Sequence, residues 1–154
     1  MNDIFEQSSE KGQEEQVKPE GLKFISILSF LGSGMSLFAN AMVFLFYETF
    51  INYLSSEEIK EVPMAFEPDL LKNYAVTAGQ TYFLLSALLY SMSLLGVYYM
   101  WNLYKKGIHF YAIAQISLLI LPLIFIDSSL SVLPGLILSG AFIYFYSRYL
   151  NLME

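Results

Sequence analysis

The sequence predicts an all-α fold, an integral membrane bundle of four antiparallel transmembrane helices, from its composition and the length of its uncharged segments. Of its 154 residues, 56% are hydrophobic and only 14% are charged, which is typical of membrane proteins. The uncharged runs of at least 20 residues are Phe24–Tyr47, Asn73–Tyr104, Gly107–Ile126 and Ser128–Ser147. About 20 residues of helix span a bilayer core of about 30 Å, and helices satisfy their own backbone hydrogen bonds in lipid.

Each run predicts one helix of a transmembrane domain that covers residues 22–150. We expect the helices at about 24–54, 69–104, 107–126 and 130–149. Lys105-Lys106 alone separates the second run from the third, and Asp127 separates the third from the fourth. Such short connections require neighbouring helices to run antiparallel. The only sizeable loop covers residues 55–72 and is expected outside the cytoplasm, with Pro68 suited to the first turn of the second helix.

The N-terminal segment, residues 1–21, is polar and acidic, with six Asp or Glu residues. It cannot bury enough apolar surface to offset the entropy of ordering, so we expect a disordered cytoplasmic tail. Lys23, the apolar run and Ala39-Asn40-Ala41 together resemble a cleavable secretory signal. The long acidic region before the run, and the apolar continuation after this triplet, favour a retained helix instead.

Basic residues near the predicted helix ends indicate the orientation. With the N-terminus in the cytoplasm, six Lys or Arg residues lie on the cytoplasmic side and two, Lys60 and Lys72, lie outside. This bias favours both termini in the cytoplasm. Aromatic residues at the ends of the runs are expected to form interfacial belts. The cytoplasmic belt is expected to contain Tyr98, Tyr99, Trp101, Tyr104, Tyr144, Tyr146 and Tyr149.

One face of the first helix carries small polar residues at spacings of three and four. They are Ser26, Ser29, Ser33, Ser36 and Asn40, with Gly32 beside them. The second helix repeats the pattern with Gly79, Ser86, Ser93 and Gly96. In lipid, helices associate through close packing of small residues and through interhelical hydrogen bonds. We therefore expect these residues to form a helix-packing seam; a polar pathway for a solute is the alternative.

Two amides, Asn40 and Gln115, are expected to be buried in the bundle. A buried amide costs free energy unless it is hydrogen-bonded, so Gln115, roughly 12 Å into its span, should find a partner. The sequence predicts no catalytic, cofactor-binding or metal-ligating residue, because it has no cysteine and its single histidine, His109, has no carboxylate beside it. The four apolar interiors also lack carboxylates, which argues against proton-coupled transport.

Two segments resemble a family of small, uncharacterised four-helix membrane proteins that is common in Bacteroidota. Phe30-Leu31-Gly32-Ser33-Gly34-Met35-Ser36 is similar to the first helix of that family. Residues 104–115 are similar to its basic turn followed by Gly, aromatic residues, Tyr and Gln. The resemblance covers the membrane region, and it implies a bacterial inner membrane without implying a mechanism.

These observations favour a non-enzymatic membrane subunit or assembly factor that acts through helix–helix contacts. Its expected partners are the lipid bilayer and either a second copy of the chain or another membrane protein. The net charge of −6 argues against a nucleic-acid partner. An oligomeric channel or facilitator for a small solute is the alternative, and the absence of paired catalytic groups weakens a third hypothesis, an enzyme acting on a lipid substrate.

Overall fold

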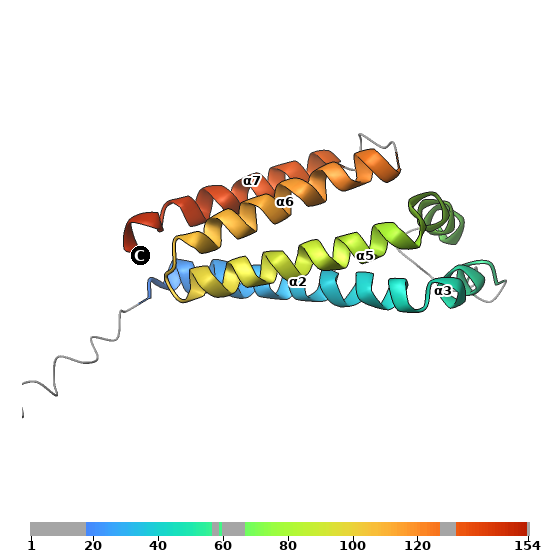
Figure 1. Ribbon diagram of the computed structural model, residues 1–154, viewed down its shortest axis with the longest axis horizontal. Coiled ribbons are helices and arrows are strands. Elements are labelled where there is room, and N and C mark those ends of the chain that lie inside the picture. Colours follow the sequence, from blue (N-terminus) through green and yellow to red (C-terminus); the bar gives the residue numbers. More distant parts are fainter. Residues whose placement is uncertain (1–17, 57–58, 60–66, 127–131, 154) are drawn as a thin grey trace, which may run out of the picture.

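The computed structural model describes residues 18–56, 59, 67–126 and 132–153, and every regular element in these ranges is a helix. The elements are α2 (Glu20–Leu45), α3 (Tyr47–Leu54), α5 (Pro68–Trp101), α6 (Lys106–Phe125), α7 (Val132–Ser147) and the 3-10 helix η2 (Leu150–Leu152) (Figure 1). The predicted all-α class is therefore confirmed.

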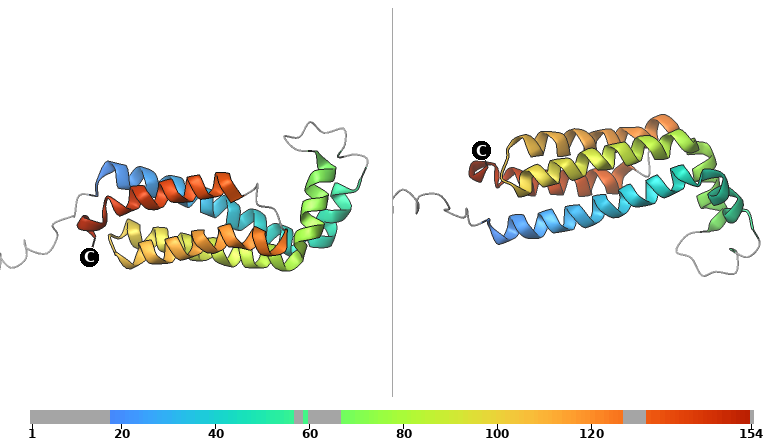
Figure 2. Two further views of the ribbon diagram at one scale, coloured as in Figure 1. Left: turned by 90° about the horizontal axis from the view of Figure 1, so that it is seen from above. Right: turned by 60° about the horizontal axis from the view of Figure 1, so that its bottom comes forward.

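Helix α5 is the central helix of the bundle. It packs along α2 on one side and along α6 on the other. Helix α7 packs on α6 but makes little contact with α2. The long helices lie side by side in all views (Figures 1 and 2). One side of the bundle, between α2 and α7, is therefore less tightly closed than the others.

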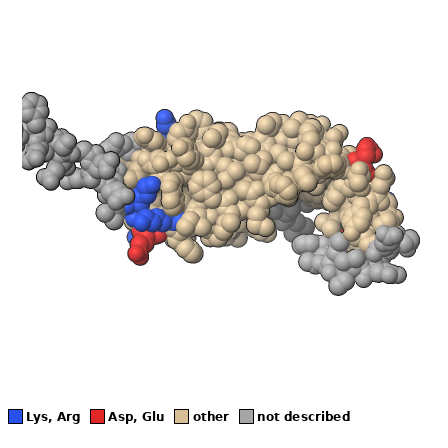
Figure 3. All heavy atoms as spheres, turned by 90° about the horizontal axis from the view of Figure 1, so that it is seen from below, with Lys and Arg blue, Asp and Glu red and all other residues tan. Residues whose placement is uncertain are grey.

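Three helices of the described chain are long and apolar enough to cross a membrane. Helix α2 has 26 residues, α5 has 34 and α6 has 20. Helix α7 is shorter, with 16 residues, and is also uncharged. The space-filling view shows a broad surface without charged side chains between the two ends of the molecule (Figure 3). These features are those of a membrane protein.

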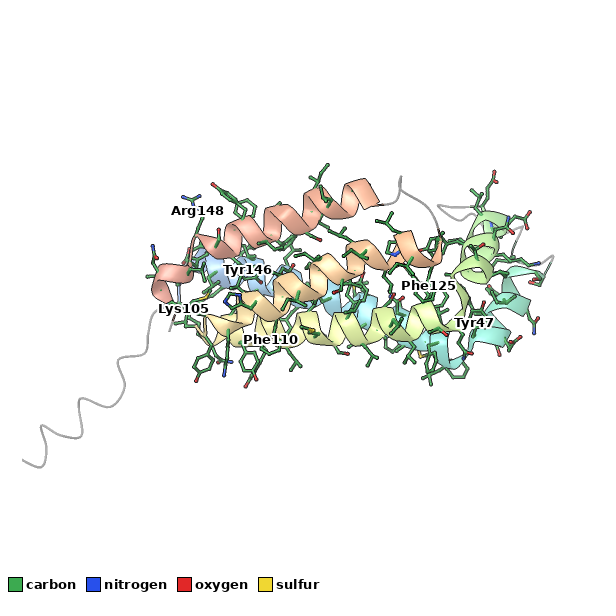
Figure 4. The ribbon with its side chains drawn as sticks, turned by 45° about the horizontal axis from the view of Figure 1, so that its top comes forward. Tyr47, Lys105, Phe110, Phe125, Tyr146 and Arg148 are labelled. Atoms are coloured by element: carbon green, nitrogen blue, oxygen red, sulfur yellow. The ribbon has the colours of Figure 1, made fainter. Side chains whose placement is uncertain are left out.

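The two ends of the bundle differ in charge and in shape. Lys105, Tyr146 and Arg148 lie at one end, which we call the basic end, whereas Tyr47 and Phe125 lie at the other (Figure 4). We call this second end the hairpin end, because α3 and the first part of α5 form a helical hairpin there.

Both helices that were expected to be continuous, 24–54 and 69–104, are interrupted at the hairpin end. Helix α2 stops at Leu45, and Phe46, with φ −115° and ψ 32°, separates it from α3. Helix α5 is kinked at Gly79, which has φ 71° and ψ 164°. This backbone conformation is essentially restricted to glycine. Because of these two breaks, α3 and residues 68–78 run across the end of the bundle instead of along it (Figure 2).

The other helix boundaries differ from the expected ones by a few residues. Helix α2 begins at Glu20, inside the expected tail, and α5 begins inside the expected loop 55–72, with Pro68 in its first turn as predicted. The helices expected at 107–126 and 130–149 cover 106–125 and 132–147. Residues 1–17, 57–58, 60–66 and 127–131 lie outside the described residues; they belong to the predicted tail and loops, except that 130 and 131 begin the helix expected at 130–149.

The basic end holds the larger of the buried apolar clusters that the structure describes. Its members are Leu22, Val97, Met100, Leu103, Ile108, Tyr111, Tyr146 and Met153. Helices α5 and α6 meet closely beside it, at Gly96 and Gly107. A Cβ atom added to Gly96 would lie 2.6 Å from the backbone nitrogen of Tyr111 and 2.9 Å from the carbonyl oxygen of Gly107. Only glycine therefore lets these two backbones approach.

Candidate functional site

A pocket of about 640 Å³ lies between α2 and α7, and we call it the α2–α7 cleft. Its walls combine large apolar residues with hydroxyl and amide side chains from four helices. The lining residues used below are Leu31, Gly32, Ser33, Ser36, Tyr74, Tyr82, Tyr90, Gln115, Leu138 and Ser139. This volume is within the range of small-molecule sites, and such sites commonly lie between the helices of bundles.

The serine-rich face of α2 is turned toward the other helices. Ser26, Ser29 and Ser33 are buried, and Ser36 is half-buried beside the cleft. Side chains three and four residues apart share one face of a helix, so the large residues between them point outward. The exposed set is Phe24, Leu31, Met35, Phe38 and Met42. The face that the sequence pattern selected on α2 is thus the one that contacts protein.

A chain of hydrogen bonds connects all four long helices at the floor of the cleft. The hydroxyl groups of Ser33 on α2 and Ser93 on α5 are 3.0 Å apart. Gln115 on α6 donates through Nε2 to the Ser93 hydroxyl at 3.2 Å, and Ser139 on α7 donates to Oε1 of Gln115 at 2.9 Å. Gln115 therefore finds two partners, as a membrane-embedded amide requires.

A second polar contact lies toward the basic end. Tyr146 on α7 donates from its hydroxyl group to Ser29 Oγ on α2 at 3.0 Å. Its ring also contacts Tyr111, with the ring centroids 5.4 Å apart. Tyr146 is completely buried, so its side chain makes contacts inside the bundle that the expected interfacial belt did not predict. Its proximity to the end of an apolar run concealed this role, because burial and interfacial position give the same sequence signal.

The glycines and serines of α5 divide into two groups. Ser86, Ser93 and Gly96 are buried in helix contacts, and Gly96 makes the closest of them. Gly79 does not belong to this seam, since it forms the kink and has nothing within 4 Å of the position of an added Cβ. Gly107, which sequence reasoning missed, is the partner of Gly96 on α6.

Gly32 and Asn40 of α2 also differ from their expected roles. Gly32 is exposed at the cleft, with nothing within 4 Å of an added Cβ. Asn40 donates from Nδ2 to the carbonyl oxygen of Ser36 in its own helix at 2.8 Å. Asn40 and Gln115 are both half-buried rather than enclosed. Gly32 therefore leaves room at the cleft, and Asn40 satisfies its amide locally.

The chemistry available in the cleft is hydrogen bonding. Serine hydroxyl groups and the Gln115 amide donate and accept hydrogen bonds without titrating near neutral pH, so they can hold a polar group of an incoming molecule. No group of three or more His, Asp or Glu side chains that could hold a metal ion occurs among the described residues. No family model matches this chain, and neither the curated proteins nor the solved structures contain a significant match to it.

Proposed function

We propose that this chain is a non-enzymatic subunit or assembly factor of a bacterial inner membrane that acts through helix–helix contacts at the α2–α7 cleft. In this proposal α2, α5, α6 and α7 cross the bilayer as four antiparallel spans. The 16 residues of α7 give a helix of about 24 Å, and its uncharged sequence and its packing on α6 support its assignment as the fourth span. The resemblance to the Bacteroidota family supports the choice of membrane.

The charge distribution supports an orientation with both termini in the cytoplasm. Figure 3 shows the Lys and Arg side chains of this face gathered at the basic end, with acidic side chains at both ends. Positive residues beside membrane spans favour the cytoplasmic side. The absence of natural cysteines makes single-cysteine labelling free of background.

The topology is tested with the variants Lys105→Cys and Lys72→Cys and a membrane-impermeant maleimide applied to intact spheroplasts. We expect Lys72→Cys to be labelled directly and Lys105→Cys to be labelled only after permeabilisation. Tags at the two termini should both report the cytoplasm. Termini on opposite sides of the membrane contradict the four-span arrangement.

The observation that carries the functional proposal is unfilled space at a glycine next to hydrogen-bonding groups. Gly32 has nothing within 4 Å of an added Cβ, although glycine inside a helix costs about 1 kcal/mol relative to alanine in water. In lipid, glycine is favoured where another helix backbone approaches closely. Ser36 and Gln115 line the same cleft and offer hydrogen bonds to that helix. A partner helix of this kind fits both features.

Site-specific photocrosslinking in native membranes tests this proposal. A benzophenone amino acid replaces Leu31 or Leu138, which line the cleft and are 59% and 62% exposed. The matched control is Leu88 on α5, which is 58% exposed and does not line the cleft. We expect one discrete crosslinked protein, or a crosslinked dimer, from the cleft positions only. Equal products from Leu88, or none from any position, contradict the proposal.

A filling variant sharpens this experiment. Gly32→Leu places a large side chain in open space, so it should leave the fold intact while it removes the crosslinked product. The equivalent change at Gly34, Gly34→Leu, is the control, because Gly34 also has open space around it but does not line the cleft. Loss of the product in both variants would show that the effect does not depend on the cleft.

A facilitator for a small solute is the second candidate, and the polar floor of the cleft favours it. The hydrogen-bonded chain from Ser33 to Ser139 crosses the whole bundle. Four helices enclose little space, so a pathway would need two or more copies of the chain. Flux of polar solutes into liposomes, lost in Gln115→Leu but retained in Gln115→Asn, would support this candidate; absence of flux across a broad solute panel counts against it.

A further inference from the structure

The helical hairpin formed by α3 and residues 68–78 is not aligned with the long helices of the bundle, and we call it the surface hairpin. Figure 2 shows both of its helices running across the end of the bundle. The bundle axis is the membrane normal if the long helices span the bilayer, so the surface hairpin lies parallel to the membrane plane. Its orientation is that of an interfacial helix.

The change of direction is fixed by two side chains that cap each other's broken helix. Carbonyl groups in the last turn of a helix have no partner inside that helix. Gln80 donates from Nε2 to the carbonyl oxygen of Phe44, in the last turn of α2, at 2.9 Å. Tyr47 donates from its hydroxyl group to the carbonyl oxygen of Ala75, one turn before the kink, at 3.0 Å. The two breaks therefore stabilise each other.

The surface hairpin carries apolar and charged residues on different sides of its second helix. Leu70 and Tyr74 are four residues apart and share one face. Tyr74 fixes the direction of that face, because its hydroxyl group lies 2.9 Å from that of Tyr82, which follows the kink and belongs to the bundle. Asp69 and Lys72 lie on other sides of the helix at 100° per residue. The face with Leu70 is thus turned toward the membrane part of the molecule.

The described chain leaves much of this face exposed, although Tyr82 covers part of Tyr74. Leu70 is 61% exposed, and Tyr74 lines the open α2–α7 cleft. Tyrosine is enriched at membrane interfaces, where its ring meets the acyl chains and its hydroxyl group meets water. The face adjoins the bundle through Tyr82, whose ring centroid lies 6.1 Å from that of Tyr74. An exposed face with Leu70 and Tyr74 suits the boundary between lipid headgroups and acyl chains.

We propose that the surface hairpin binds the outer leaflet, with Leu70 and Tyr74 at the acyl-chain boundary and Asp69 in the aqueous headgroup region. This binding rests on apolar burial rather than on attraction to anionic lipids. Residues 55–72 contain five acidic residues and two lysines, a balance that does not attract a negative surface. The proposal rests on the orientation proposed above, with both termini in the cytoplasm. Leu70 does not line the α2–α7 cleft, so a test at this position does not depend on what occupies the cleft.

The test uses the full chain in vesicles of phosphatidylethanolamine and phosphatidylglycerol, with one introduced cysteine at a time carrying a fluorophore. The test position is Leu70→Cys, and its matched control is the adjacent exposed position, Asp69→Cys. Leu88→Cys on α5 is the reference for a deep lipid-facing site, since Leu88 is 58% exposed on the bundle and does not line the cleft. Quenchers are aqueous iodide and nitroxide lipids labelled near the headgroup or near the end of the acyl chain.

We expect iodide to quench the Leu70→Cys label severalfold less than the Asp69→Cys label, and the shallow nitroxide to quench Leu70→Cys better than the deep one does. Leu88→Cys should show the reverse depth preference. Replacing phosphatidylglycerol with phosphatidylcholine should leave these ratios unchanged.

Three results overturn the proposal. Equal iodide quenching at Leu70→Cys and Asp69→Cys would place the surface hairpin in water. Shielding of Leu70→Cys from both iodide and nitroxide lipids would show that protein covers it. Best quenching of Leu70→Cys by the deep nitroxide would place the hairpin inside the bilayer core.

Discussion

Glycine allows close backbone packing at the basic end of the bundle, whereas at the α2–α7 cleft it leaves open space. At the basic end, Gly96 and Gly107 bring two backbones into contact beside a buried apolar cluster. At the cleft, Gly32 has open space around it, and α7 makes little contact with α2. The difference teaches that stability is concentrated where α5 meets α6, whereas the cleft side retains room for another molecule.

The largest expected effect is at the closest backbone contact. Gly96→Leu forces a side chain against the backbone of α6, and we expect a loss of unfolding free energy of about 3 kcal/mol or more, the upper end of overpacking costs. Gly34→Leu is the matched control because nothing lies within 4 Å of its added Cβ. Unfolding titrations with dodecyl sulfate in mixed micelles measure both. Equal losses would remove the contrast between packed and open glycines.

The next largest effect compares the two faces of α2. Ser33→Leu enlarges a buried residue between α2 and α5 and removes its hydrogen bond to Ser93. We expect a cost of about 1–3 kcal/mol from overpacking, with roughly 0.6 kcal/mol more from the lost bond. Leu31→Ala should cost much less, because this side chain is exposed and its truncation removes few contacts within the chain. Thermal melts in one detergent that rank Leu31→Ala as the more damaging change would reverse the assignment of the two faces.

A backbone effect without any steric contact is expected at the kink. Gly79→Ala adds a methyl group in open space, but its φ of 71° is strained for any residue with a Cβ, at about 2 kcal/mol. Gly34→Ala is the control, since that glycine is helical and equally open. Melting temperatures of the two variants give the comparison. A neutral Gly79→Ala would mean that the kink relaxes to an ordinary helix.

The smallest effect concerns the hydrogen-bonded chain at the cleft floor. Gln115→Leu removes the bonds to Ser93 and Ser139, and we expect a loss of about 1 kcal/mol, because each bond in a membrane protein contributes roughly 0.6 kcal/mol on average. The same unfolding titration checks it. A gain in stability in this variant would mean that the polar floor is maintained for binding at the expense of the fold.

The buried face of α2 could be predicted from the spacing of its residues along the helix, but not from their size. The serines of α2 recur at three and four residues, and this periodicity placed Ser26, Ser29 and Ser33 on the buried side. The small size of Gly32 suggests a place in the same seam, but a position one residue before Ser33 is rotated by about 100° around the helix. The size of a residue does not show which side of the helix it lies on. In the structure Gly32 lies on an open surface.

The two helix breaks could not be predicted because they depend on contacts between distant residues. The spacing of seven that joined Gly79 to Ser86 and Ser93 assumed a continuous helix, and no proline marks either break. The side chains of Gln80 and Tyr47 each donate a hydrogen bond to a backbone carbonyl beside the break in the other helix. Such reciprocal capping arises only once α2 and α5 are packed together.

These breaks also set the thickness of membrane that the protein matches. The whole of α5, with 34 residues, would be about 51 Å long as a straight helix, whereas Gln80–Trp101 is about 33 Å long. The shorter length is close to the hydrocarbon thickness of about 30 Å, and hydrophobic mismatch has a cost for every ångström. The position of Gly79 in the chain therefore determines the length of the straight part of α5, and with it the bilayer thickness that the helix matches. Moving it by one helical turn would change the preferred bilayer thickness by about 5 Å, which reconstitution into lipids of graded acyl length would detect.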